Sequence, residues 1–534
     1  MQNKRLFIFI FMIIGVVSMA SRCRDAGGSK TFTIAMDGKF NTLDPIGAIT
    51  VDANSERLRT LMYNSLVKKN EKFEYVGDLA KEITASDDDL AYTFKLHDNV
   101  KFQNGNVLTS ADVKYTLDKL FESEGAKGAA FFETIDGKKT PIITGIETPD
   151  EKTVVIKISR AELGNQLKLN LVPIAIIPKD SPVGKDSGAD KNPPPGTGAY
   201  KFKSFDTAQN IVELEAFDGC WEGAPNIKAI QVKILADANA LQAELLAGRV
   251  DLAPGATNLE PDTLKSLGAS PNLQVVNLPS SNIQYLWFNT EAEPVKNVKV
   301  RQAIAHSVNR EKIITDLLDG QAKIAHSILP TDSWAYSDGV KYDFNVEKAK
   351  QLLDEAGFKD KDGDGMREME KVVFKISSGN KSTSQYAQLI QSQLKDVGIP
   401  VGIESLEFRT MLDQVMNGQF TMTTGRWVGG NQDPIFYKDL FATSEIPSKD
   451  RPTRNRGRYS NEEVDKLLEG AIKELDRDKA KADYAKVQDI ISRDVPLFPL
   501  WYPNNMIVAS KKVGNIKMNA SGDWDFVRTL TIEP

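Results

Sequence analysis

The residues best suited to chemistry lie in the segment GRWVGGNQDP, residues 425–434. It combines a cation, an indole ring and a carboxylate, Arg426, Trp427 and Asp433, with adjacent glycines and two amides. Adjacent glycines give nothing to pack and a buried arginine needs a partner, so this composition differs from that of a core segment. The composition is compatible with a turn, a phosphate loop, a catalytic loop or the wall of a ligand cleft.

A second candidate is the acidic stretch DKDGDGMRE, residues 360–368. Its aspartates match the first ligand positions of a calcium-binding loop: Asp360, Asp362 and Asp364. The acid expected at the twelfth position is replaced by Lys371, and Asp-Gly pairs also form tight turns without a metal. The stretch is therefore predicted to be a turn, with a weak calcium site as the alternative.

A third candidate is the cationic stretch PSKDRPTRNRGRY, residues 447–459. Its cations are Lys449, Arg451, Arg454, Arg456 and Arg458. A solvated loop is the simplest interpretation. Alternatively, Arg456 or Arg458 pairs with buried acids or with a ligand carboxylate, since the guanidinium fork fits both.

Other chemistry is not favoured. The chain has only three histidines and two cysteines, and these do not cluster as zinc or haem ligands. It lacks the nucleophile-elbow, zinc-protease, Walker and dinucleotide-binding motifs, so neither an enzyme nor a cofactor is predicted. The net charge of −6 and the pI of about 5.5 argue against a nucleic-acid partner.

The N-terminus predicts export. Lys4 and Arg5 precede the apolar run 6–19 and a stretch of small residues, the pattern of a signal peptide over residues 1–22. Cleavage after Ala20 would release a free protein, whereas ASRC resembles a bacterial lipobox that would leave Cys23 lipidated. No apolar run in the chain reaches the length of about 20 residues that a membrane-spanning helix needs. The expected location is therefore the periplasm or the cell envelope, with a lipid anchor as the only membrane contact.

Strands and helices alternate along the body of the chain. The apolar run 283–288 predicts a buried strand, and helices are predicted to end at Gly357 and Gly398. Thr109 or Ser110 is predicted to cap one helix. A capping box is predicted at Ser460 and Glu463, and strands over 507–510 and 527–532 are expected to close the chain.

Several segments together resemble one family. They include YTFKLHDNVKFQNGNVLTSADVKYTLDKL (92–120), PGTGAYKF (195–202), WEGAPNIKAIQVKIL (221–235), LLAGRVDLA (245–253), YLWFNTEAEPVKNVKVRQAIAHSVNREKII (285–314), FNVEKAKQLLDEAGF (344–358), NRGRYSNEEVDKLL (455–468) and DVPLFPLWY (494–502). In this order they are similar to the family 5 extracellular solute-binding proteins, which supply oligopeptides, dipeptides or nickel to ABC importers.

This resemblance implies an α/β, two-lobed periplasmic-binding-protein fold of type II-like form, with an extra domain in the first lobe and a hinge between the lobes. The implied division is a signal peptide (1–22), a tether (23–31), lobe I (30–66, 192–282 and 503–534), an extra domain (67–191) and lobe III (283–502). The implied role is capture of a small solute, above all a peptide, and its delivery to an ABC permease by a monomeric binding protein. An oligosaccharide, a metal chelate or an anionic metabolite is the alternative solute, and a secreted hydrolase the alternative class.

The resemblance also implies a set of ligand-binding residues, which are Asn282, Tyr285, Arg426, Trp427, Gly430, Asn431, Asp433, Trp501 and Tyr502. In peptide-binding relatives the tryptophan flanks the ligand, and an acid three residues later pairs with the peptide amine. Here that position is Gly430. Asp433 is the nearest acid, although an Asp-Pro step more often caps the following helix. We therefore expect recognition that does not depend on a free amine at Gly430.

Overall fold

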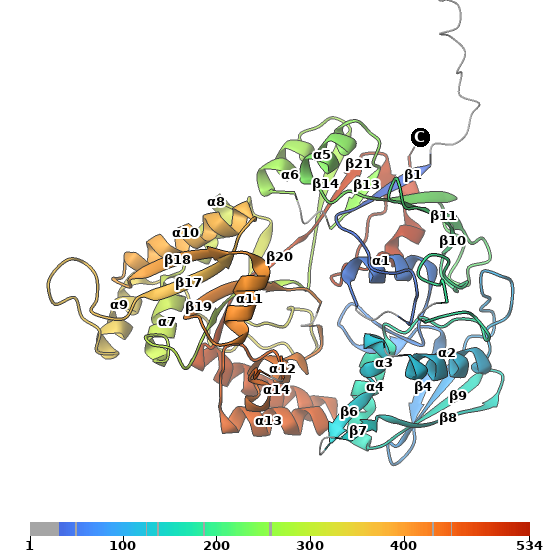
Figure 1. Ribbon diagram of the computed structural model, residues 1–534, viewed down its shortest axis with the longest axis horizontal. Helices are drawn as coiled ribbons and strands as arrows, with labels where there is room; N and C mark the ends of the chain where they lie inside the picture. The colour runs from blue at the N-terminus through green and yellow to red at the C-terminus, as the bar shows by residue number, and fades with distance from the viewer. Residues whose placement is uncertain are drawn as a thin grey trace, which may run out of the picture.

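The computed structural model describes residues 31–533, apart from 48–50, 124, 136–137, 185–186, 256–258, 430–431 and 450. The predicted signal peptide and Cys23 lie outside these residues. The described chain forms two halves, each built around one large β-sheet (Figure 1). Among the described residues, no helix is both long and apolar enough to cross a membrane.

The sheet of the first half has seven strands in the order β10-β11-β12-β1-β13-β21-β14. Their bounds are Tyr200–Asp206 (β10), Ile211–Ala216 (β11), Ala229–Ile234 (β12), Phe32–Met36 (β1), Leu252–Pro254 (β13), Asn505–Ser510 (β21) and Leu273–Leu278 (β14). The central strand β1 is buried along its length and pairs in parallel with β12 and β13. These strands come from three separate parts of the chain, all inside the ranges predicted for lobe I.

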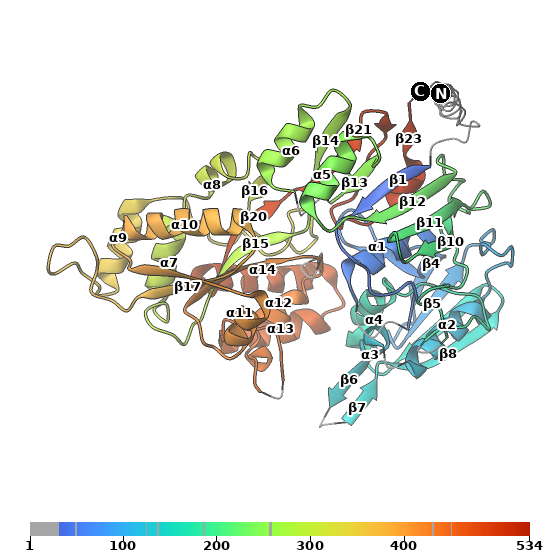
Figure 2. The same ribbon diagram turned by 45° about the horizontal axis from the view of Figure 1, so that its top comes forward.

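Helices cover this sheet. Helices α5 (Ala238–Leu246) and α6 (Pro261–Gly268) lie over β14 and β21 (Figure 2). Their buried leucines pack against Val508 of β21 in one apolar cluster. Helix α1 (Ala53–Met62) lies beside the sheet on the opposite side and begins at Asp52, whose side chain accepts a hydrogen bond from the Ser55 amide.

An additional unit packs on the first half (lower right in Figure 1). It contains the antiparallel sheet β4-β5-β9-β8 and the hairpins β2–β3 and β6–β7. The bounds are Val67–Lys69 (β2), Tyr75–Gly77 (β3), Ala80–Ala85 (β4), Ala91–Leu96 (β5), Phe132–Ile135 (β6), Lys138–Pro141 (β7), Ile143–Asp150 (β8), Thr153–Ile158 (β9), Ser110–Glu122 (α2), Ala126–Ala129 (α3) and Gly164–Leu171 (α4). As predicted, Thr109 caps α2, and it does so through a capping box with Asp112. The core of this unit is continuous with that of the first sheet.

The sheet of the second half has six strands in the order β16-β20-β15-β19-β17-β18. Their bounds are Ala322–Ile324 (β16), Leu497–Pro503 (β20), Ile283–Phe288 (β15), Met422–Trp427 (β19), Val372–Ser377 (β17) and Val401–Leu406 (β18). Every residue of β15 is buried, which explains its continuous apolar sequence. Leu286 and Phe288 face one apolar cluster, whereas Tyr285 and Trp287 face another.

Helices lie on both faces of the second sheet. Helices α7 (Val298–Ser307), α9 (Val346–Glu355) and α10 (Lys381–Lys395) contribute to the cluster around Leu286. On the other face lie α12 (Phe436–Phe441), α13 (Glu462–Lys473) and α14 (Arg477–Asp494). The remaining helices of this half are α8 (Arg310–Asp316) and α11 (Phe408–Met416).

The chain crosses between the two large sheets at two adjacent places. Residues 279–282 join β14 to β15, and Asn504 alone separates β20 from β21. The side chain of Asn505 donates a hydrogen bond to the carbonyl of Pro279 at 3.0 Å, so the two crossings are side by side. Two short neighbouring crossings form a hinge about which the halves can rotate.

Local predictions had mixed outcomes. The helix ends at Gly357 and Gly398 are confirmed, because both residues have positive φ angles, of 90° and 86°. The capping box at Ser460 is wrong, because Asn461 caps α13 with a side chain that accepts from two backbone amides. The strand predicted over 527–532 is also wrong over most of its length: residues 527–529 belong to a 3₁₀ helix, and only Thr531–Ile532 pairs as β23 with Val513–Gly514, β22.

Candidate functional site between the two halves

The segment 425–434 begins in strand β19 and continues toward helix α12. In the antiparallel pairing of β19 with β15, Trp427 lies opposite Ile283 and Arg426 lies opposite Gln284. Because successive side chains alternate between the faces of a sheet, Arg426 and Trp427 point to opposite faces. The predicted neighbours therefore belong to different environments.

Trp427 belongs to a cluster of aromatic rings. Its ring is stacked on Tyr285 at 6.0 Å between centroids and meets Trp287 and Phe436 edge-on at 6.1 and 5.2 Å. The side chain is half-buried, whereas Tyr285 is only 4% exposed. The indole N–H of Trp427 is buried and has no hydrogen-bond partner among the described residues. The ring is thus held rigidly while its polar atom lacks an acceptor.

Arg426 is exposed, yet the surrounding protein desolvates it and lowers the pKa of its guanidinium. Its guanidinium interacts electrostatically with the buried Tyr386 of α10. The hydroxyl of Tyr386 accepts a hydrogen bond from Gln284 at 2.9 Å. A side chain that solvent reaches although protein surrounds it is typical of a cleft wall.

The carboxylate of Asp433 is engaged within the protein. One oxygen accepts a hydrogen bond from the backbone amide of Ile435 at 2.9 Å, in a turn just before α12 begins. The capping interpretation is wrong, because the N-cap of α12 is Ile435 and no side chain makes a capping hydrogen bond there. The other oxygen accepts a hydrogen bond from the hydroxyl of Tyr75 in strand β3. Burial and Asp433 together hold the pKa of the Tyr75 hydroxyl well above its ordinary value, so Tyr75 is the donor.

The hairpin β2–β3 makes further contacts with the second half. Lys69 donates to the side-chain oxygen of Gln432 at 3.2 Å, and Glu74 pairs with Arg477 at 3.0 Å. The amide group of Gln432 in turn donates to Ser281, in one of the chain crossings, at 3.1 Å. The hairpin, the hinge and segment 432–433 are therefore tied together by hydrogen bonds, and the two halves are in contact here.

A large cavity lies next to this contact, with a volume of about 710 Å³. The additional unit contributes one wall, including Tyr75, Arg160 and Lys168, and the helices α12–α14 contribute the other. Asp433 lines the cavity, whereas Trp427 and Arg426 are not among its lining residues. A volume of this size suits a ligand of several residues or a comparable small molecule.

Three of the four arginines in the segment 447–459 have acidic partners. Arg451 pairs with Glu445 at 3.2 Å, Arg454 with Asp439 at 2.7 Å and Arg458 with Glu291 at 2.5 Å. Arg456 is the exception. Its guanidinium carbon lies 5.4 Å from the ring centre of Trp427, and burial lowers its pKa.

The other predicted ligand residues are dispersed. Trp501 and Tyr502 are 2% and 6% exposed; Trp501 packs edge-on against Tyr386, and the hydroxyl of Tyr502 donates to the carbonyls of Ser327 and Leu329. Their burial favours a packing role. Asn282 is half-buried in the hinge crossing. Gly430 and Asn431 lie outside the described residues.

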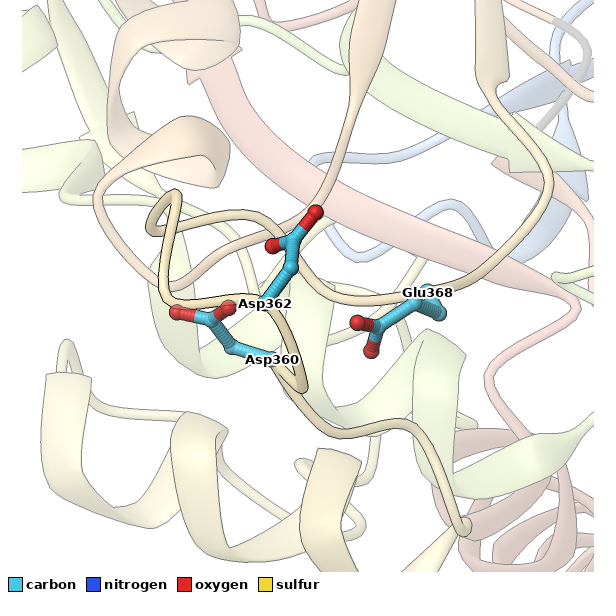
Figure 3. Close-up of side chains that lie close together, drawn as sticks. All are labelled: Asp360, Asp362 and Glu368. Carbon is cyan, nitrogen blue, oxygen red and sulfur yellow. The ribbon is translucent and has the colours of Figure 1, made fainter.

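The acidic stretch 360–368 lies far from the contact between the halves, in the loop between α9 and β17. Asp360, Asp362 and Glu368 place carboxylate oxygens within 4.8 Å of one another, and all three residues are exposed (Figure 3). Each carboxylate oxygen of Asp360 accepts a hydrogen bond from a backbone amide, one from Gly363 at 2.8 Å and the other from Gly365 at 3.0 Å. The loop is thus a hydrogen-bonded turn, as predicted, and Glu368 rather than Asp364 completes its acidic group.

Tyr75, Lys69 and Arg477 are contact residues that were not predicted. Tyr75 is separated from Asp433 by 358 positions, and nothing in the local sequence of the hairpin indicates that partner. The lack of an acidic partner for Arg456 among the described residues was equally inaccessible, because the acids that neutralise its neighbours lie up to 167 positions away.

Comparison with known proteins agrees with this architecture. Residues 74–448 match the model for bacterial extracellular solute-binding proteins, family 5. The chain is 30% identical over 501 residues to the oligopeptide-binding protein AppA of Bacillus subtilis, covering 91% of this chain and 88% of AppA. It is 28% identical over 460 residues to heme-binding protein A of Haemophilus influenzae, covering 82% and 81% of the two chains.

A solved structure of the Bacillus subtilis AppA protein, in complex with a nonapeptide, is also similar. The two chains are 27% identical, the TM-score is 0.70, and the match covers 94% of this chain and 99% of the other. The two-lobed α/β fold with an extra domain is therefore confirmed. The chain belongs to the family 5 bacterial extracellular solute-binding proteins.

Proposed function

We propose that this protein is the substrate-binding component of an ABC importer and that its solute is a peptide. The observation that carries this proposal is the pair of adjacent crossings between two halves that meet around a cavity of about 710 Å³. Rotation about such a hinge encloses and desolvates a solute, and the closed form is what a permease can recognise. The similarity to AppA, whose structure contains a nonapeptide, supports a peptide as the solute.

The contacts at the hairpin β2–β3 support a closing motion. Tyr75 and Asp433 belong to different halves, as do Glu74 and Arg477, and the two pairs lie beside the cavity. Each pair can form only when the halves approach, so each favours the closed state. Ligand that bridges the same halves adds to this preference, which couples binding to closure.

The test is binding without turnover. The purified full chain, incubated with a mixture of random hexapeptides, is expected to melt at a higher temperature and to return the peptides intact by mass spectrometry. A ligand at a hundred times its Kd stabilises the native state by about 2.7 kcal/mol. Steady cleavage of the peptides would instead support the alternative class, a secreted hydrolase.

The role of the peptide amine is tested separately. Asp433 already accepts hydrogen bonds from Tyr75 and Ile435, so it is not free to take the role that the family gives to an acid at the position of Gly430. N-acetylation of a bound peptide is therefore expected to change the Kd less than tenfold. A hundredfold loss would show that another acid binds the amine.

A solute other than a peptide is the second candidate, because heme-binding protein A has a similar sequence over most of its length. If no peptide stabilises the chain, native mass spectrometry of protein purified without refolding identifies the class of solute that it retains. Oligosaccharides, metal chelates and anionic metabolites are the classes to compare.

We further propose that the chain is an exported monomer that contacts an ABC permease and reaches the membrane through a lipid on Cys23. Replacing Cys23 with serine is expected to move the protein from the membrane fraction to the soluble fraction of the cell envelope. An unchanged distribution would favour cleavage after Ala20.

A further inference from the structure

The aromatic cluster around Trp427 contains several hydrogen-bond donors that lack acceptors. The indole N–H groups of Trp427 and Trp287 and the Nε–H of Arg456 are buried and have no partner among the described residues. The hydroxyl of Tyr285 likewise has no hydrogen bond to any residue that the structure describes. Buried polar groups are satisfied in more than about 90% of cases, so a cluster of unsatisfied donors is unusual.

The donors are close to one another. The ring centre of Trp427 lies 5.4 Å from the guanidinium carbon of Arg456, 6.0 Å from the ring centre of Tyr285 and 6.1 Å from that of Trp287. Gly457 follows Arg456 in the chain, and its backbone packs directly against the indole of Trp287. A Cβ atom at Gly457 would lie 2.3 Å from the indole nitrogen of Trp287. This close packing leaves no room for a side chain that could supply the acceptor from that direction.

The chemistry of these donors restricts what can bind. Indole and guanidinium groups donate hydrogen bonds and cannot accept them, so their partner must be an acceptor. Burial raises the pKa of the Tyr285 hydroxyl, which keeps it protonated and able to donate. Arg456 also carries a positive charge that no acid neutralises within the described chain, and a partly buried cation without a counter-charge is unfavourable.

Neighbouring arginines show that the lack of a partner is specific to Arg456. Arg451, Arg454 and Arg458 belong to the same segment, and each forms an ion pair with an acid of this chain. The two terminal nitrogens of Arg456 form no hydrogen bond or ion pair with a described residue, and unlike its Nε they are not buried. They are therefore accessible to a ligand. The charge of Arg456 is therefore available to the solute.

We propose that Arg456, together with the hydroxyl of Tyr285 and the indole of Trp427, forms a subsite that binds a carboxylate group of the solute. A carboxylate is planar, so it can form two parallel hydrogen bonds with the guanidinium fork. It also supplies the acceptors that the Tyr285 and Trp427 donors lack. This inference rests on the proposed solute-binding function and names the group that is recognised.

The experiment compares two peptide mixtures on the immobilised full chain. The first contains random hexapeptides with free C-terminal carboxylates and with aspartate and glutamate. The second is matched but ends in amides and contains asparagine and glutamine instead. The wild type is expected to retain roughly ten times more of the first mixture than of the second. This ratio follows from the loss of a charge-assisted hydrogen bond in the second mixture. The net charge of −6 opposes nonspecific retention of acidic peptides.

Variants identify the residue responsible. Arg456→Gln is expected to abolish the preference for carboxylates, Arg456→Lys to retain part of it, and Tyr285→Phe to weaken binding about two- to tenfold. Arg454→Gln is the matched control, since Arg454 is two residues away and paired with Asp439, and it is expected to behave like the wild type. A purely structural role for Arg456 would lower stability without changing the ratio between the mixtures.

Three results would overturn the subsite. They are equal retention of the two mixtures by the wild type, an unchanged preference in Arg456→Gln, and loss of the preference in Arg454→Gln. If neither mixture is retained, the peptide proposal fails and a second measurement decides on the subsite. Citrate at constant ionic strength should then raise the melting temperature of the wild type more than that of Arg456→Gln, and equal shifts would refute carboxylate binding.

Discussion

The two ends of segment 425–434 differ in how their polar groups are satisfied. At the Asp433 end, both carboxylate oxygens accept hydrogen bonds, from Ile435 and from Tyr75 of the other half. At the Trp427 end, the indole N–H and the adjacent Arg456 have no acceptor among the described residues. At the first end the acceptors and donors are matched, whereas at the second the described residues leave donors without acceptors.

This difference separates two roles that a cleft segment can have. Groups that are satisfied across the two halves stabilise the closed arrangement, whether or not solute is present. Donors that remain unsatisfied beside a rigid ring mark where a ligand gains free energy by supplying acceptors. In our proposal, the carboxylate nearest to the family's amine-binding position therefore serves closure, and the solute is recognised at the opposite end.

The largest expected effect concerns the ring itself. Trp427→Ala removes contacts with three aromatic rings and is expected to lower the free energy of unfolding by about 3 kcal/mol, measured by urea denaturation. Trp221→Ala, in the first half, is a control that removes a half-buried indole whose ring is tilted against that of His97 at 4.9 Å. Only Trp427→Ala should also weaken solute binding. An unchanged unfolding midpoint for Trp427→Ala would contradict the packing described here.

A smaller effect is expected at the Asp433 end. Tyr75→Phe removes the hydrogen bond to Asp433 and should favour the open arrangement, weakening solute binding by about 1–2 kcal/mol. The measurements are the Kd by calorimetry and the radius of gyration of the ligand-free chain by X-ray scattering, which should increase. Tyr115→Phe is the control, because its hydroxyl bonds to Ser181 within the additional unit at 2.8 Å. Identical scattering from wild type and Tyr75→Phe would show that this bond does not hold the halves together.

The smallest expected effect concerns the buried charge of Lys69, which lies at the Asp433 end. Burial lowers the pKa of Lys69, although Asp433 opposes this shift. The ordinary pKa of lysine is about 10.4. A lysine whose pKa is lower than this in the folded state destabilises the fold at every pH below that folded-state pKa. The penalty decreases as the pH rises above the folded-state pKa and is gone once the pH has passed about 10.4. Lys69→Met should therefore gain a few tenths of a kcal/mol at pH 7 relative to the wild type, and lose that advantage near pH 10.5.

The control for this prediction is Lys72→Met, since Lys72 is exposed in the turn of the same hairpin. Its effect on the free energy of unfolding should be within about 0.5 kcal/mol. If Lys69→Met is instead less stable at pH 7, its hydrogen bond to Gln432 outweighs the cost of burying its charge.

Much of the fold could be predicted because its signals are local. The buried strand Ile283–Phe288 is read from its apolar run, and the helix ends at Gly357 and Gly398 from the freedom of glycine at positive φ. The cap of α13 was misplaced by one residue, because Ser460 and Asn461 are both good caps and only the packed helix selects one. The length of the strand predicted over 527–532 was overestimated for a related reason. Whether a segment forms a strand depends on the partner strands that the fold makes available to it.

The sequence alone determined that the chain carries an export signal pattern, that its body alternates strands and helices, and that its ordered motifs match a solute-binding family. It also singled out segment 425–434, because residue types and spacing are local properties. Only the tertiary structure decided that Asp433 is engaged by Tyr75, and that Arg456, unlike the three other arginines of its segment, has no acidic partner among the described residues. Hydrogen bonds and ion pairs are short-ranged, so residues hundreds of positions apart must be brought together before a satisfied group can be distinguished from an unsatisfied one.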